Sequence, residues 1–199
     1  MIEVLAISQG ILRIFVLALA LAVFSLARQI GVLHERVAPM GALMTDRALH
    51  VGDAAPTLDT DDLQGRPVHL GGAREDGRNQ VLLFVAPNCP VCKKLLPIAK
   101  SFARGERDQV ALVLVGDGER AEQERFIRRE GLEALPYIVA PQIGMQFQVG
   151  KLPYAVLIDA QGTIRAKGLV NSREHLESLL VARETGYASI QEYLKAQGG

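Results

Sequence analysis

The chain has 199 residues, with 22 Lys and Arg against 22 Asp and Glu, so its formal net charge is zero. This balance argues against a nucleic-acid binder, and a hydrophobic content of 49% excludes a disordered chain. Its two cysteines, Cys89 and Cys92, are too few for a multi-disulfide scaffold or a four-cysteine zinc site.

The most apolar part of the chain is residues 1–27, where Ser25 is the one polar residue between Ile14 and Leu26. As a helix, residues 7–27 would be about 31 Å long, which matches a hydrocarbon core of about 30 Å. We therefore expect an N-terminal transmembrane anchor over 1–27. A signal peptide cleaved after Ala27 and a buried soluble helix are the alternatives.

Residues 28–49 form the next segment, a juxtamembrane linker that Pro39 and Gly41 interrupt. It is either a helical extension that spaces a globular domain from the bilayer or a contact surface for a membrane partner. The arginines of this segment outnumber the positive charges before the span, so the positive-inside rule favours a cytoplasmic C-terminal domain.

Residues 50–199 have the pattern of an α/β domain. Apolar runs predict strands, and helical spacing predicts helices between and after them. The expected strands are 81–86, 110–115, 137–141, 154–159 and 163–170, and the expected helices are 90–104, 119–132, 172–185 and 188–196. Ser172 is expected to cap the third helix. This order predicts a mixed sheet with helices on both faces.

The chemistry is expected in the CPVC motif, residues 89–92, which follows a buried strand and opens a helix. Unpaired amides and the helix dipole stabilise a thiolate at that position. We therefore expect Cys89 to be an exposed nucleophile and Cys92 to resolve its mixed disulfide. A zinc site would need two more ligands, which the four histidines do not supply at ligand spacing. Two inert buried thiols are the other alternative.

The motif and its surroundings resemble the thioredoxin superfamily. Pro97 stands where members carry a helix-kinking proline, and residues 51–70 look like the N-terminal β-extension of membrane-tethered thiol reductases and peroxiredoxin relatives. Residues 152–154 match the loop with a cis-proline that faces the motif. The resemblance implies a cis Pro153 and a Leu152 that offers backbone groups to an extended substrate; an ordinary proline at the start of a strand is the alternative. The expected motif and groove residues are Asn88, Pro90, Val91, Leu152 and Pro153.

Two positions depart from the thioredoxin pattern. Leu83 stands where many thioredoxins have an acidic residue, and Asn88 stands where they have Trp. The missing carboxylate leaves the proton acceptor for Cys92 unassigned.

Over nearly its full length the chain is similar to the methylamine utilization protein MauD family, whose members are accessory proteins for making methylamine dehydrogenase. The likeness rests on the N-terminal span and on residues 28–44, 51–56, 87–97 and 151–159. It implies thiol–disulfide work on the small subunit of methylamine dehydrogenase as substrate, together with an integral-membrane accessory protein of the same pathway. It also implies a single-pass protein of the bacterial inner membrane with its domain in the periplasm, against the charge count.

Three functions follow from these features. The first is a protein disulfide oxidoreductase whose one redox group is the Cys89–Cys92 disulfide, with no metal or other cofactor and with the direction of electron flow open. The second is a substrate-binding chaperone or scaffold with secondary redox activity. The third is a thiol peroxidase, which Pro87 and Asn88 fit poorly.

Overall fold

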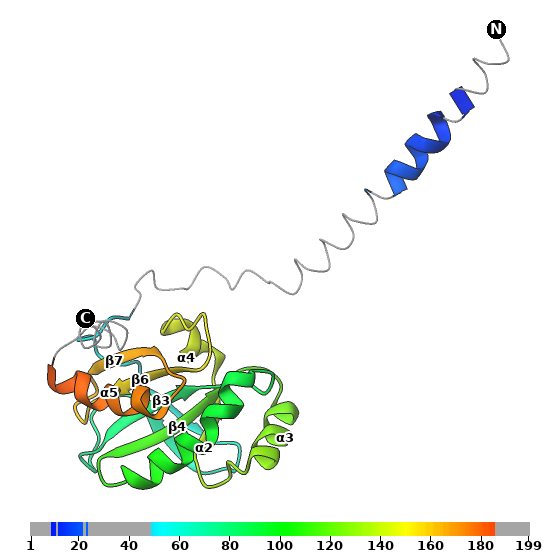
Figure 1. The fold of residues 1–199 in the computed structure, drawn as a ribbon. Helices are drawn as coiled ribbons and strands as arrows, with labels where there is room; N and C mark the ends of the chain where they lie inside the picture. The colour runs from blue at the N-terminus through cyan, green and yellow to red at the C-terminus, as the bar shows by residue number, and fades with distance from the viewer. Residues whose placement is uncertain (1–8, 11, 22, 24–48, 186–199) are drawn as a thin grey trace. The chain divides into compact units, whose positions relative to one another are not determined.

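The computed structural model describes residues 9, 10, 12–21, 23 and 49–185 (Figure 1). The chain divides into two compact units, Met1–Met44 and Thr45–Gly199. In the first unit the described residues are helical and exposed. No helix within the described residues has the length and apolar character needed to cross a membrane. Residues 28–48 of the expected linker of 28–49, and the helix expected at 188–196, lie outside the described residues.

The second unit is built on a five-stranded mixed sheet, as predicted. Its spatial order is β5-β4-β3-β6-β7. The first three strands are parallel, and β6 and β7 run antiparallel to their neighbours. The strands are β3 (Asn79–Phe84), β4 (Val110–Gly116), β5 (Tyr137–Val139), β6 (Tyr154–Ile158) and β7 (Ile164–Leu169).

Alternate residues of the buried strands pack into two apolar clusters, one on each face of the sheet. On one face, Val81 and Leu83 of β3 pack with side chains of three helices. On the other face, Leu82 and Phe84 pack against a short helix and an N-terminal hairpin. The first face carries α2 (Pro90–Gly105), α3 (Arg120–Glu130) and α5 (Arg173–Thr185), and the second carries α4 (Pro141–Gln146), β1 (Leu58–Asp61) and β2 (Pro67–Leu70). Helices therefore lie on both faces, as expected.

Two of the boundaries that differ from the prediction do so for local backbone reasons. The strand expected at 137–141 ends at Val139, because Pro141 occupies the first turn of α4, a helix that the sequence reading missed. The helix expected at 119–132 ends at Glu130, because Gly131 adopts the left-handed conformation with φ of 62°. The predicted cap of α5 is confirmed, since the N–H of His175 donates to Ser172 Oγ at 3.3 Å.

Candidate functional site

The CPVC motif lies where the chain turns from the central strand into α2. The Cys89 N–H donates to the carbonyl of Ala86 at 3.2 Å, which closes the turn after β3. Cys89 is the N-cap of α2, and Pro90 occupies the first helical turn. The Cys92 N–H, which has no backbone partner in the first turn of the helix, donates to Cys89 Sγ at 3.0 Å. The two cysteines form a disulfide with their Cα atoms 5.2 Å apart.

The two sulfur-bearing residues differ in burial. Cys92 is fully buried in the apolar cluster that also contains Leu83 and Leu95, whereas Cys89 is half-buried at its edge. This difference agrees with the expected order, in which Cys89 is the accessible residue. Leu83 is itself fully buried, so the position of the missing carboxylate belongs to the apolar core beneath Cys92.

The predicted cis-proline is confirmed, since the Leu152–Pro153 bond is cis. Tyr154 begins β6 and pairs with Phe84, the last residue of β3. Because of this pairing, the proline loop and the loop that leads to the CPVC motif leave neighbouring strands at the same end of the sheet. Pro153 is buried, and its carbonyl accepts the Val170 N–H at 3.1 Å.

Two apolar side chains of the predicted groove are exposed at this end of the sheet. Val91, between the cysteines, is 43% exposed, and Leu152, before the cis-proline, is 37% exposed. Lys93 and Lys94 on the first turns of α2 are also exposed. An extended apolar peptide segment could therefore contact both residues without a rearrangement of the core.

Glu122 is a residue of this region that the sequence reading missed. Helical charge spacing predicts that Glu122 is one of the surface carboxylates of α3. Instead, Glu122 is half-buried and accepts a hydrogen bond at 3.3 Å from Nδ2 of Asn88, the residue directly before Cys89. Burial raises the pKa of the nearby Tyr137 hydroxyl, and the charge of Glu122 adds to this effect. The only sequence signal was Asn88 itself, a polar residue where the thioredoxin pattern has Trp.

In the part of the chain that the structure describes, His, Cys, Asp and Glu nowhere form a group of three that could hold a metal ion. The absence of a metal or other cofactor stays an expectation.

Comparison with known proteins places this geometry in a family. A family of thioredoxin-like domains matches residues 67–184. Methylamine utilization protein MauD of Paracoccus denitrificans is 48% identical over 99% of this chain and 98% of its own. Its counterpart in Paracoccus versutus is 50% identical over 96% of this chain and 94% of its own. The chain belongs to the MauD family.

Solved structures show the fold of this MauD-family chain. StoA from Bacillus subtilis is 22% identical, covers 63% of this chain and 96% of its own, and superposes with a TM-score of 0.55. The thioredoxin domain of a thiol-disulfide oxidoreductase from Bacteroides vulgatus is 20% identical, covers 66% and 98%, and also has a TM-score of 0.55. The predicted thioredoxin-like fold and the predicted family are both confirmed.

Proposed function

We propose that this MauD-family chain is a thiol–disulfide oxidoreductase that acts through Cys89 and Cys92. The observation that carries the proposal is the disulfide between a half-buried helix N-cap and a fully buried residue one turn later. Only one of the two sulfurs is then open to a protein thiolate, which fixes the order of events.

In the oxidising direction, a substrate thiolate attacks Cys89 Sγ and displaces Cys92 as a thiolate, giving a mixed disulfide. A second substrate thiolate then attacks the substrate sulfur of that bond and releases Cys89. The substrate gains a disulfide, and the protein gains two electrons and, after protonation, two thiols. The reverse sequence reduces a substrate disulfide, with Cys89 as the attacking thiolate.

The helix end favours the thiolate of Cys89 in both directions. The Cys92 N–H that donates to Cys89 Sγ at 3.0 Å is held in place by the first turn of α2. A hydrogen bond to a charged acceptor contributes about 1.5–3 kcal/mol, roughly twice as much as a bond to a neutral one. The exposed Lys93 and Lys94 add positive charge near the same helix end.

The proposed substrate is the small subunit of methylamine dehydrogenase, in which the chain would form or isomerise disulfides during maturation. Membership of a family named for methylamine utilization supports a substrate in that pathway. The exposed Val91 and Leu152 would contact an extended segment of the subunit. An integral-membrane accessory protein of the same pathway is the proposed second partner.

We further propose that residues 1–27 anchor the chain in the inner membrane as a single span, with the thioredoxin-like domain in the periplasm. The apolar composition of this segment supports the anchor, and so does the exposure of its described side chains, such as Leu12, Leu17 and Leu21. Disulfide formation in a substrate requires an oxidising compartment, which supports the periplasm.

The test is maturation of the dehydrogenase in cells that carry the full chain with Cys89→Ser and Cys92→Ser together. We expect the small subunit in these cells to lack its disulfides, while the amount of the variant in the membrane matches that of the wild type. Normal maturation with the double variant would contradict the redox role and assign the chain to the chaperone class. Cys92→Ala repeats the test without a hydroxyl in the apolar core.

A further inference from the structure

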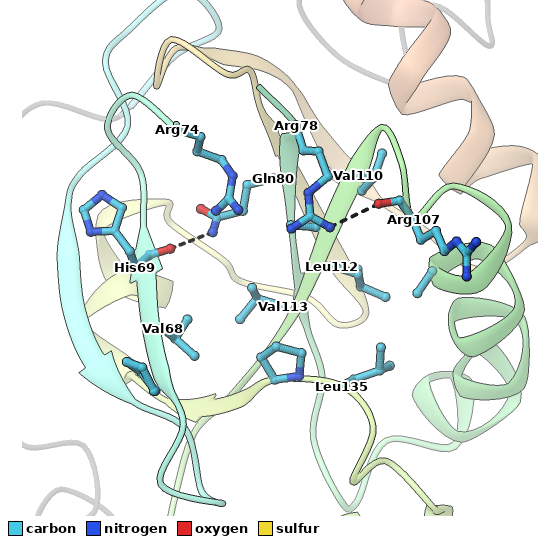
Figure 2. Close-up of a pocket in the computed structure, with 14 residues that line it drawn as sticks. Val68, His69, Arg74, Arg78, Gln80, Arg107, Val110, Leu112, Val113 and Leu135 are labelled. Carbon is cyan, nitrogen blue, oxygen red and sulfur yellow. Dashed lines mark hydrogen bonds between the residues drawn. The ribbon is translucent and has the colours of Figure 1, made fainter. Parts of the chain in front are cut away.

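At the opposite end of the sheet from the disulfide lies a pocket of about 460 Å³, between β2 and the edge of β4 (Figure 2). The part of β4 that lines the pocket is its first half, whereas the disulfide follows the carboxyl end of the parallel strand β3. From Gln80, which lines the pocket, to Val85 is five residues, or about 16 Å along the strand. A ligand can therefore bind in the pocket while a substrate cysteine reacts at the disulfide.

Along this pocket, no strand of the described chain pairs with the outer edge of β4. β5 pairs with β4 only from Leu114 onward, where the Leu114 N–H donates to the carbonyl of Pro136 at 2.9 Å. Pro136 has no N–H, so the hydrogen-bond ladder between β4 and β5 cannot extend to the preceding residue of β4 whose N–H and C=O point toward β5. That residue is Leu112, and within the described chain no strand pairs with its outward N–H and C=O. An open strand edge is a template for an added strand.

The walls of the pocket are apolar on both sides of the open edge. Val68 of β2 and Val113 of β4 line it from one face of the sheet, and Leu112 and Leu135 line it from the other. The side chains of an added strand, which point alternately to the two faces of the sheet, would therefore pass an apolar wall on each face.

The rim of the pocket is basic (Figure 2). Arg74 and Arg78 both bind the carboxylate of Asp76, so one negative charge is shared between two guanidiniums. Arg78 also donates to the carbonyl of Arg107 at 3.1 Å, which fixes the rim to the turn before β4. The Arg107 side chain is 78% exposed, and its Nε lies 3.6 Å from Asp108 Oδ1. The residues that line the pocket include these three arginines and no Asp or Glu, so the lining is basic.

We propose that this pocket binds an extended, acidic segment of a partner protein, which adds to the edge of β4 as a further strand. Its backbone pairs with the N–H and C=O of Leu112, its apolar side chains contact the walls, and its carboxylates face Arg107 and the Arg74–Arg78 pair. Because the pocket is separate from Cys89 and Cys92, this inference does not rest on the proposed redox function.

The test measures binding of a fluorescein-labelled peptide, Val-Glu-Val-Glu-Val-Glu, to the full chain in nonionic detergent by fluorescence anisotropy. The proposal expects roughly fivefold weaker binding to Arg107→Glu than to wild type, and no comparable change for Arg128→Glu. Arg128 is an exposed arginine on α3, outside the pocket, and matches the change of charge. Binding should also weaken in 1 M NaCl.

Two altered peptides separate strand addition from simple charge attraction. A peptide N-methylated at alternate residues keeps its carboxylates but loses one hydrogen-bonding edge, and we expect it to bind at least roughly fivefold more weakly. The lysine analogue, Val-Lys-Val-Lys-Val-Lys, should not bind. Equal binding of the methylated and unmethylated peptides, or of the Glu and Lys peptides, would overturn the proposal.

Two further measurements complete the test. If the affinity for the peptide fell as the concentration of the chain rose, a second copy of this chain would be competing for the edge of β4. That result would also overturn the proposal. The Cys89→Ser/Cys92→Ser variant should bind the peptide as wild type does, so the redox role and the docking pocket can fail separately.

Discussion

Asp159, at the end of β6, is a buried carboxylate that closes the β6–β7 turn. Its Oδ1 accepts the N–H groups of Gln161 at 3.0 Å and Thr163 at 2.8 Å, and its Oδ2 accepts from Arg165 Nε at 2.5 Å. The side chain is 6% exposed. Because β6 begins directly after Pro153, this turn also holds the strand that carries the cis-proline loop.

Asp159→Asn removes the charge and keeps the shape. Each hydrogen bond to a charged acceptor contributes about 1.5–3 kcal/mol, against about 0.5–1.5 kcal/mol for a neutral pair. The amide can still accept the two backbone N–H groups, but its NH₂ group faces the Arg165 donor. Discounting that bond because Arg165 is 44% exposed, we expect a loss of about 2–3 kcal/mol in the free energy of unfolding.

The pH dependence of this loss is a second check. Burial alone would raise the pKa of Asp159, but the N–H groups of Thr163 and Gln161 and the Arg165 guanidinium outweigh it and hold the pKa below its usual value. The carboxylate therefore stabilises the fold fully above the unfolded pKa of about 3.9, and this stabilisation is lost as the pH falls through the folded pKa. The gap between wild type and Asp159→Asn should narrow below about pH 4.

The assay is urea unfolding of the full chain in nonionic detergent, followed by circular dichroism at pH 7 and pH 3. Asp108→Asn is the matched control, because Asp108 is 91% exposed and its contact with Arg107 is 3.6 Å long. The control should change stability by less than about 0.5 kcal/mol. If Asp159→Asn lowered the free energy of unfolding no more than the control does, or if the loss were the same at pH 3 as at pH 7, the Asp159 carboxylate would not stabilise the turn as its hydrogen bonds indicate.

Other variants test the packing beside the site and the site itself. Tyr137→Phe removes the hydroxyl that donates to the buried Gln123 Oε1 at 2.7 Å, so it should lower the free energy of unfolding by about 1–3 kcal/mol. The double variant Tyr137→Phe with Gln123→Leu should recover part of this loss in thermal unfolding, and no recovery would contradict the pairing of the two side chains. In the reduced chain, iodoacetamide should label Cys89 roughly a hundredfold faster than the fully buried Cys92, as measured by peptide mass spectrometry; equal rates would contradict the assigned burial. Val91→Asp places a charge on the exposed apolar contact beside Cys89 and should lower kcat/KM for a protein substrate by about tenfold at unchanged Tm; an unchanged kcat/KM would remove Val91 from the groove.

The elements that sequence predicts well here are those in which local pattern and packing agree. The β3 run is apolar at every position after Gln80 because the strand is central and buried on both faces, which a continuous apolar run indicates. α2 combines a proline in its first turn with apolar residues at helical spacing, and Leu95, Ala99 and Phe102 are buried as that spacing predicts.

The features that sequence could not reveal depend on residues far apart in the chain. Glu122 is half-buried and accepts a hydrogen bond from Asn88, 34 positions away, whereas its helical spacing alone indicated an exposed surface charge. In the basic rim, Arg74 and Arg78 precede β3 and Arg107 follows α2, and only the fold brings these segments together. α4 is six residues long, too short for an apolar period to mark it.

The most direct test of the redox assignment is the mixed disulfide trapped by Cys92→Ser in the full chain. With the resolving thiol removed, a bond between Cys89 and a substrate cysteine cannot be reopened from within the chain. We expect an intermolecular disulfide between Cys89 and the methylamine dehydrogenase small subunit, identified by peptide mass spectrometry and lost on addition of dithiothreitol. With Cys89→Ser, the buried Cys92 should trap far less. An equal yield of trapped subunit through Cys92 in the Cys89→Ser variant, or no trapped subunit through Cys89, would contradict the assignment of Cys89 as the residue that reacts with the substrate.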